Sequence, residues 1–546
     1  MANSKHLFDH HKVLDILESI DCNESEDGGG DDSEIDEDFR PDELNEEEDS
    51  ECDDDENVPL AKILTKSSTE NMETPVFTWV NRKFKPPDSQ FTGTKVAAPD
   101  SQKTDTPLGY FQRFVTQEMI ENIVNQTNMY SVQKNGVSIN TTSKEIEQVL
   151  GMYFHMGLVR MDGVRQYWAA NTRYDPVASV MSRNRFQQIL RTLHFVDNMA
   201  VSDCTKKKDR LWKLRPWLHK MRENCLKLTP SEHCSIDEMM CAYRGKTSSI
   251  RQYIKGKPHP WGFKIWGRAD PAGMLYDFDV YQGGSGTRTK LGQGGDVVMM
   301  LTSTLETGRN YKIYADNLFT SLPLMVELKK KCMFYTGTVR QNRMGKCELK
   351  SEKELKKQGR GASDERVERT HNISAVRWFD NRAVTMLSTL TGCEPVVSAK
   401  RWDKTTKQQK DVTMPSVIGD YNRNMGGIDL LDSYLAKYRY KMRSRRWYMY
   451  IFWHFVNVAL VNAWNMYRRE HSLLKLPKDD LLLQRHFQST LANSLVHVAA
   501  QRKRGRPSEA SCISTVVTPK RQTRPSYDTS HDNHDHWPLK DSKRGR

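Results

Sequence analysis

The segment Cys234–Gly245 places two acidic residues inside an otherwise apolar, strand-like run. It reads Cys-Ser-Ile-Asp-Glu-Met-Met-Cys-Ala-Tyr-Arg-Gly, so Asp237 and Glu238 stand among residues that favour burial. A carboxylate on a half-buried strand costs several kcal/mol unless a hydrogen bond or a metal ion compensates it. A turn, or an ion pair with Arg244 or Arg251, would explain Asp237 in structural terms alone. The chain therefore needs a fold that gives these acids a partner.

Two later stretches supply further acids. Tyr311–Ser321 is another β-branched and aromatic run, and its strand-like part ends on Asp316. In Met425–Tyr434, Asp429 and Asp432 are three residues apart and share one face if the segment is helical. Acids on three separate elements form an arrangement that holds two hard divalent cations and leaves positions open for phosphate. The pattern indicates a metal-dependent phosphoryl-transfer core, although a chain with 70 acidic residues contains many such triplets.

Four sequence blocks surround these acids. They are Ser235–Met240, Arg251–Pro258 followed by Trp261–Lys264, Asp316–Ser321 and Met425–Asp432. In this order they resemble the signature blocks of the piggyBac transposase family, and the similarity runs from about Pro107 to Trp464. The resemblance implies an α/β fold with an RNase H-like DDE/D catalytic core. It also implies a catalytic, metal-binding triad of Asp237, Asp316 and Asp429, with Asp432 as an additional catalytic acid.

The resemblance further implies a DNA transposase that uses two Mg²⁺ or Mn²⁺ ions. Such an enzyme would act as a homodimer on double-stranded DNA, cleave at the element ends and transfer strands at TTAA targets. Two other functions remain open. One is a host-domesticated DNA-binding or chromatin protein that keeps the fold without moving DNA. The other is an RNase H-like nuclease that uses the same metals without strand transfer.

Composition and element pattern divide the chain into seven segments. Strands that alternate with helices after residue 231 indicate a mixed α/β layer fold. The predicted segments are a disordered acidic N-terminal region and linker (1–106), a helical dimerisation and DNA-binding region (107–230), the two parts of the catalytic core (231–340 and 416–438), an insertion domain (341–415), a second helical DNA-binding region (439–500) and a basic, disordered tail without a zinc domain (501–546).

Several elements are predicted more closely. Thr142-Ser-Lys-Glu145 has the spacing of a capping box, and helices are expected at Arg183–Phe195, Arg210–Leu226 and Trp447–Tyr467. The last of these is expected to pack on the N-terminal helical region. Asp277 and Asp279 compete with the triad on chemistry alone. They lie in mid-strand outside the family blocks, and an exposed sheet face explains them.

The formal net charge of +12 hides a strong asymmetry. Residues 24–56 contain 20 acidic residues and one arginine, a net charge of −19, so the rest of the chain carries +31. A surface this basic favours polyanionic partners such as DNA or RNA. The acidic stretch is predicted to be disordered, either as a nucleic-acid mimic or as a solubilising tail.

A basic segment, residues 437–446, follows Asp429. Cations recur there at every second residue with aromatic residues between them, which predicts an extended segment that presents five cations to a phosphate backbone. A charged, solvated connector is the alternative. Residues Arg502–Pro507 contain an Arg-Gly-Arg-Pro core, typical of an AT-hook or of a nuclear localisation signal. The residues predicted to bind DNA are Lys255, Lys257, Lys437, Arg439, Lys441, Arg443, Arg445, Arg446, Arg504 and Arg506.

Cysteine usage and the termini predict the cellular location. The ten cysteines are scattered and form no CxxC motif, which favours a reducing compartment. The N-terminus lacks a secretory apolar region, and together with the basic tail this predicts the nucleus. The most apolar run, Tyr448–Trp464, is interrupted by His454, Asn457 and Asn462. It is predicted to be a buried helix rather than a membrane span.

Overall fold

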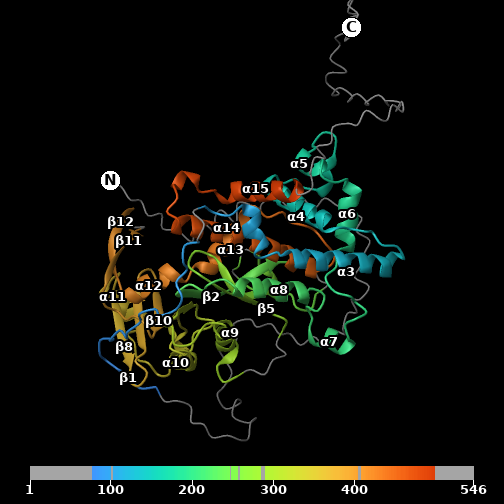
Figure 1. The fold of residues 1–546 in the computed structure, drawn as a ribbon. Coiled ribbons are helices and arrows are strands. Elements are labelled where there is room, and N and C mark those ends of the chain that lie inside the picture. The colour runs from blue at the N-terminus through green and yellow to red at the C-terminus, as the bar shows by residue number, and fades with distance from the viewer. Residues whose placement is uncertain are drawn as a thin grey trace, which may run out of the picture. The chain divides into compact units, whose positions relative to one another are not determined.

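The computed structural model describes residues 77–99, 103–245, 248–255, 257, 259–283, 289–403 and 407–497. The predictions for the acidic stretch at residues 24–56 and for Arg504 and Arg506 lie outside these residues. Element labels follow Figure 1.

The ordered chain opens with a series of helices. Helix α8 begins five residues after its predicted start, because Pro216 lacks an N–H group and fits only the first turn of a helix. The elements are α2 (Pro107–Gln112), α3 (Gln117–Asn135), α4 (Ser143–Leu158), the 3₁₀ helix η3 (Val164–Trp168), α5 (Asp175–Ala178), α6 (Arg183–Thr192), α7 (Asp203–Lys208) and α8 (Arg215–Leu226).

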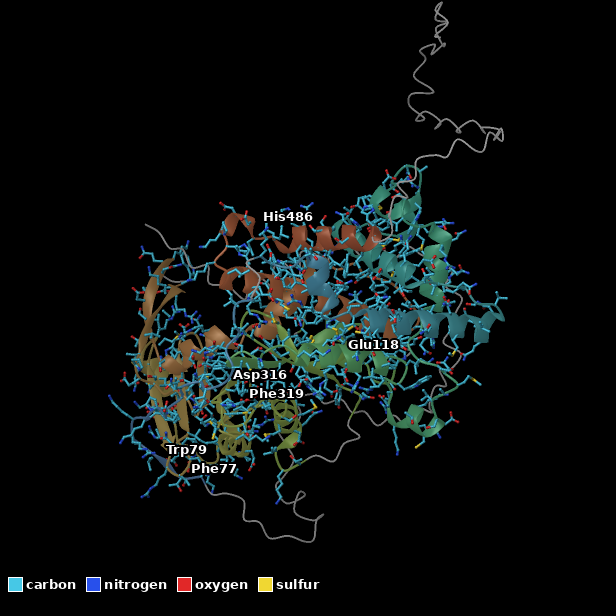
Figure 2. All side chains as sticks on the ribbon, in the orientation of Figure 1. Phe77, Trp79, Glu118, Asp316, Phe319 and His486 are labelled. Carbon is cyan, nitrogen blue, oxygen red and sulfur yellow. The ribbon has the colours of Figure 1, made fainter. Side chains whose placement is uncertain are left out.

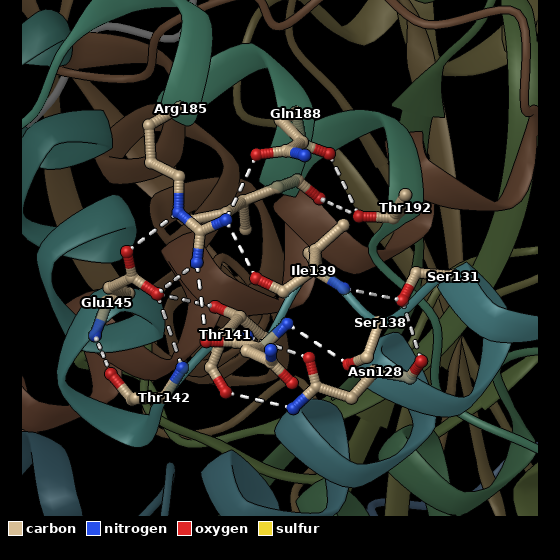
Figure 3. Close-up of polar contacts among 12 residues, drawn as sticks. Asn128, Ser131, Ser138, Ile139, Thr141, Thr142, Glu145, Arg185, Gln188 and Thr192 are labelled. Atoms are coloured by element: carbon tan, nitrogen blue, oxygen red, sulfur yellow. Dashed lines mark hydrogen bonds and ion pairs between the residues drawn. The ribbon is translucent and has the colours of Figure 1, made fainter. Parts of the chain in front are cut away.

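The predicted capping box at the start of α4 is confirmed. The Thr142 hydroxyl accepts a hydrogen bond from the Glu145 N–H at 3.3 Å, and the Glu145 carboxylate accepts one from the Thr142 N–H at 3.3 Å. Arg185 of α6 binds the same carboxylate at 2.7 Å and donates to the Ile139 carbonyl at 2.9 Å (Figure 3). One glutamate thus caps α4 and ties α6 to it.

Ten strands in the described part of the chain form one mixed sheet, in the order β1-β8-β9-β10-β7-β6-β2-β4-β3 with β5 also paired to β4. Strand β6 runs parallel to β2 and β7, and the other pairs are antiparallel. The strands are β1 (Trp79–Val80), β2 (His233–Ala242), β3 (Gln252–Tyr253), β4 (Trp261–Ala269), β5 (Leu275–Val280), β6 (Lys312–Ala315), β7 (Phe334–Thr338), β8 (Ser363–Glu368), β9 (Ser374–Phe379) and β10 (Ala383–Ser388).

The segment 341–415 continues this sheet. Strand β10 pairs with β7, so β8, β9 and β10 extend the sheet beyond β7. Strands β11 (Val397–Asp403) and β12 (Gln408–Met414) form a separate two-stranded sheet. Two short helices precede these strands, the 3₁₀ helix η4 (Gln341–Arg343) and α11 (Glu352–Gln358).

Helices cover both faces of the sheet around β2. Successive residues of β2 point to opposite faces of the sheet and belong to two separate hydrophobic cores. Met239 packs in one core with Ile428, and Ile236 packs in the other with Leu324. Helices α9 (Gly292–Thr302) and α10 (Leu322–Lys330) supply the second core. Helices α12 (Ser416–Asn424) and α13 (Gly427–Lys437) also pack against β2.

The prediction that Asp277 lies on an exposed sheet face is wrong. The Asp277 side chain is fully buried, and Arg222 of α8 donates to its two oxygens at 2.6 and 3.2 Å. The Thr304 hydroxyl donates to the same carboxylate at 3.1 Å. Because helix α8 covers β5, an acid on this strand is buried, and the ion pair explains why it is tolerated.

The C-terminal helices return to the N-terminal ones, as predicted. Helix α14 (Tyr448–Leu473) packs on α2 and α15 (Gln484–His497) on α4, next to them in Figure 1. The Asn457 amide donates to the Tyr153 hydroxyl at 2.6 Å. The apolar run Tyr448–Trp464 is buried within α14, which confirms that prediction. Across the described residues, no helix is both long and apolar enough to cross a membrane.

Candidate active site

Two of the predicted catalytic acids lie side by side at the centre of the sheet. Strands β2 and β6 are parallel with Ile236 opposite Ala315, and the next residue on each chain is Asp237 and Asp316. The Asp316 carboxylate accepts the Leu318 N–H at 2.8 Å, which holds it where the strand turns away. Figure 2 labels Asp316 near the middle of the molecule. The pairing of two parallel strands therefore brings together acids that are 79 positions apart.

Helix α13 brings the other two acids to the same place. A Cβ atom on Gly427 would lie 2.2 Å from the Asp270 carbonyl oxygen and 2.5 Å from the Ser235 hydroxyl, so only glycine fits. Ser235 lies two residues before Asp237 and on the same face of β2. This close approach sets the first turn of α13, with Asp429, beside the strand that carries Asp237.

The electrostatics show that the acids share one region. Burial raises the pKa of Asp237 well above its usual range, and the charges of Glu238, Asp429 and Asp316 raise it further. Burial is also the main cause that raises the pKa of Asp316, and it raises the pKa of Asp432 to about 7 with the help of Asp429. Such shifts are expected where carboxylates outnumber the cations near them.

Lys257 is the cation whose charge acts most strongly on Asp237, Asp316 and Asp432. Burial would lower its pKa, but the charges of Asp237, Glu238, Asp429 and Asp432 outweigh burial and raise it. Its ammonium donates to the Glu238 carbonyl at 3.3 Å. One carboxylate oxygen of Glu238 is buried without a hydrogen-bond partner. Lys257 thus compensates only part of the negative charge gathered here.

The donor chemistry of this acid cluster fits a hard divalent cation. Every candidate ligand is a carboxylate oxygen, the type that Mg²⁺ and Mn²⁺ prefer, and a cation would lower the raised pKa values. Within the described ranges, no three acidic, histidine or cysteine side chains stand close enough to bind one ion as they are. The acids are therefore gathered but do not form a closed set of ligands.

Tyr421 is a neighbour of the acids that sequence reasoning missed. It lies on α12, and its pKa is raised by burial and by the charges of Asp316, Asp237 and Asp429, so its phenol stays protonated. A hydrogen bond to the Thr338 side chain opposes this shift and holds the ring toward the sheet. The available signal was its position, four residues before the block that begins at Met425.

The predicted basic segment alternates between exposed and buried residues. Residues 439–444 form neither helix nor strand, and exposed Lys441, Arg443 and Arg445 alternate with inward-facing Tyr440 and Met442. With α6 and α14 this segment lines a solvent-open hollow of about 700 Å³. The period-two prediction is therefore confirmed for these three cations.

The remaining cations of the segment differ. Lys437 is the last residue of α13. Arg439 is half-buried, and its charge opposes the rise in the pKa of Asp432. Arg446 donates to the carbonyls of Leu190 and Leu193 at 2.5 and 2.8 Å and so anchors the segment to the end of α6. Sequence alone gave no signal for this anchor, because it depends on tertiary contact. Lys255 is exposed between β3 and β4.

Comparisons with known proteins agree with this fold. A family model described as Transposase IS4 matches residues 106–464. The human PiggyBac transposable element-derived protein 2 is 34% identical over 398 residues, which cover 71% of this chain and 66% of that protein. The human PiggyBac transposable element-derived protein 3 is 32% identical over 417 residues, 75% of this chain and 68% of that protein. The chain thus spans slightly less than two thirds of the first relative.

A solved structure shares the fold. The cryo-EM structure of a piggyBac transposase synaptic complex with hairpin DNA matches with a TM-score of 0.62 at 23% identity, over 74% of this chain and 83% of that chain. The fold and the family model together place this chain in the class of transposase-type proteins. Within that class the chain belongs to the piggyBac transposase family. The predicted family and the mixed α/β fold are confirmed.

Proposed function

We propose that this protein is a piggyBac-type DNA phosphoryl-transfer protein whose chemistry takes place at Asp237, Asp316, Asp429 and Asp432. The observation that carries the proposal is the register of β2 and β6, which sets Asp237 beside Asp316. Helix α13 adds the other two acids at the same edge. A carboxylate cluster of this kind has no evident structural purpose, because burial and the neighbouring acids raise the pKa of Asp237 and of Asp432.

Asp237, Asp316 and Asp429 would hold two Mg²⁺ or Mn²⁺ ions. When bound, such ions would supply activation of a water or a 3′-hydroxyl and stabilisation of the negative charge that develops on the phosphate oxygens. Asp432, three residues after Asp429 on α13, would orient the site. Lys257 would neutralise the phosphate that enters, because it interacts electrostatically with Asp237, Asp429 and Asp432.

The proposed partner is double-stranded DNA. Lys441, Arg443 and Arg445 present exposed cations from a segment that follows α13 directly, so a duplex held there would pass the acid cluster. The solved relative is described as a synaptic complex with hairpin DNA, which supports the same class of partner. Strand transfer at TTAA and a homodimer are parts of this proposal that rest on the family resemblance. A nuclear location is a further part, and it rests on the basic tail and the cysteine usage.

A domesticated DNA-binding protein is the second candidate. The two human relatives are named as transposable element-derived proteins, which favours a member of the family that has taken another role. In that case DNA binding would persist without cleavage. A nuclease without strand transfer is distinguished only by its products.

The proposal is tested with purified full-length protein, Mg²⁺ or Mn²⁺, and a supercoiled plasmid that carries candidate ends flanked by TTAA. Metal-dependent nicking or joining that is lost in both Asp237→Ala and Asp429→Ala supports it. The matched control is Asp279→Ala, an acid on β5 outside the cluster, which should keep the activity. DNA binding without cleavage under either metal, while an active family member cuts its own ends, would support the domesticated binder instead.

A further inference from the structure

An exposed aromatic pair lies on the hairpin formed by β3 and β4. Tyr253 and Trp261 are directly opposite each other in the antiparallel register, and their ring centroids are 4.9 Å apart. Tyr253 is 52% exposed and Trp261 is 40% exposed. Unlike a single exposed ring, two adjacent rings present a continuous aromatic surface to solvent. We call these two residues the aromatic pair.

The pair is held in place rather than loose. The guanidinium of Arg251 lies 4.1 Å from the centroid of the Trp261 ring and donates to the Gly245 carbonyl at 2.9 Å. The Trp261 carbonyl accepts the Tyr243 N–H at 3.1 Å. A cation over an indole ring and two backbone anchors together fix the orientation of the ring.

The aromatic pair shares a sheet face with the acid cluster. Asp237 is opposite Gly267 in the antiparallel register of β2 and β4, and side chains on alternate residues of β4 from Gly267 to Trp261 share that face. Six residues along a strand span ~20 Å. The pair therefore lies a few nucleotides along a DNA strand from a phosphate at the acids.

Packed aromatic rings link the pair to the basic segment. Phe263, two residues after Trp261, stacks on Tyr243 at 4.9 Å and contacts Trp447 at 5.4 Å. Trp447 directly follows the basic segment that ends at Arg446. Cations thus flank the pair on both sides, Arg251 and Lys255 on its own hairpin and the basic segment beyond Trp447.

We propose that the aromatic pair is a stacking platform for an unpaired nucleobase of the DNA strand that enters the acid cluster. Aromatic rings with flanking cations are the combination that binds single-stranded nucleic acid, because every base has a π-face and every linkage a negative charge. A paired base inside a duplex cannot reach such rings, so the platform selects DNA with an unpaired end or a distorted junction. This inference rests on the proposed function.

The test compares a blunt DNA duplex with the same duplex carrying a short single-stranded extension. The extension contains 2-aminopurine at successive positions, and Asp237→Asn protein is used as the parent to prevent cleavage. The parent should bind the extended DNA about tenfold more tightly than the blunt duplex, which corresponds to ~1.4 kcal/mol. Its 2-aminopurine fluorescence should be quenched at one position a few nucleotides from the junction.

Trp261→Ala on this parent should lose both the preference and the quenching and keep its affinity for the blunt duplex. Tyr253→Ala, at the more exposed residue, gives a second variant in case Trp261→Ala does not fold. Trp261→Phe should keep part of the preference because it keeps a ring. Trp402→Ala is the matched control, since this indole is 57% exposed on β11.

Equal affinity of the parent for both DNAs, or full preference in both alanine variants, would overturn the platform and leave the proposed function intact. Failure of the wild-type chain to bind either DNA would instead overturn the proposed function together with the platform. The two failures are therefore distinguishable in one titration.

Discussion

Gly427 at the start of α13 lies directly against Ser235 on β2, two residues before Asp237. A methyl group at Gly427 would meet the Ser235 hydroxyl at 2.5 Å and the Asp270 carbonyl oxygen at 2.2 Å. This contact fixes the distance between the helix that carries Asp429 and Asp432 and the strand that carries Asp237. The geometry of the acid cluster thus depends on a residue without a side chain.

Gly427→Ala is therefore expected to abolish metal-dependent cleavage and to cost ~1–3 kcal/mol of unfolding free energy, because the start of α13 or the Asp270 backbone must shift. A Cβ atom on the preceding Gly426 would meet nothing within 4 Å, so Gly426→Ala is the matched control and should keep its activity. Nicking assays and urea denaturation measure the two effects. An active Gly427→Ala protein would show that the close contact does not position the acids.

The exposed cations of the basic segment should act on affinity alone. Joint substitution of Lys441, Arg443 and Arg445 by alanine is expected to weaken binding to any duplex. The plot of log K against log salt concentration should become shallower by about 0.9 per lost phosphate contact, or nearly 3 in all. Substitution of three exposed lysines on α11, Lys353, Lys356 and Lys357, removes the same charge elsewhere and should leave the slope unchanged.

Arg446→Ala should behave differently from these three. Its guanidinium holds the carbonyls of Leu190 and Leu193, so its loss should lower the free energy of unfolding by ~1–3 kcal/mol. Thermal unfolding without DNA measures this. A variant that unfolds like the wild type and loses only DNA affinity would show that Arg446 contacts phosphate instead.

The ion pair between Arg222 and Asp277 should be needed for stability and not for chemistry. Arg222→Ala leaves a fully buried carboxylate without its partner, at a cost of about 2 kcal/mol after allowance for the 36% exposure of the arginine side chain. Asp277→Asn added to Arg222→Ala should recover part of that loss. Arg309→Ala, which breaks an exposed pair with Glu306, should cost less than ~1 kcal/mol. Additive losses in the double variant would contradict this account.

His454 should make the fold sensitive to acid. Burial in α14 lowers its pKa to about 3, with a smaller contribution from the charge of Arg439. Between that value and about 6.5 the unfolded chain binds a proton that the folded chain does not. The contribution of neutral His454 to the free energy of unfolding is therefore fully present above about pH 6.5. It declines as the pH falls, by about 2 kcal/mol at pH 5.

His454→Leu should flatten this decline in urea titrations between pH 5 and pH 7. His219→Leu, at an exposed histidine on α8, serves as the control and should keep it. An unchanged slope in His454→Leu would mean that other groups dominate the acid sensitivity.

Local chemistry made part of the fold predictable from sequence. The spacing of Thr142 and Glu145 predicts a capping box because both bonds form within one helical turn. The alternation of Lys441, Arg443 and Arg445 with inward-facing residues follows from the two-residue period of an extended chain. The four sequence blocks around Asp237, Asp316 and Asp429, taken in their order, carried the family resemblance.

What sequence could not give depends on partners distant in the chain. Asp277 has the alternation of an exposed face, but helix α8 covers it and supplies Arg222. Arg446 belongs to a run of cations, and only the approach of α6 gives it two carbonyls to bind. Strands β8, β9 and β10 continue the central sheet because β10 pairs with β7, a pairing that local patterns in 341–415 do not specify.

The most direct test counts the Mn²⁺ ions that bind to the full-length chain, by calorimetry and by the loss of the free-ion electron paramagnetic resonance signal. Two ions are expected to bind per chain, with binding lost in Asp237→Asn and Asp316→Asn and unchanged in Asp279→Asn. Absence of Mn²⁺ binding by the wild-type protein with and without duplex DNA, or binding that survives Asp237→Asn, would contradict a two-metal site at these acids.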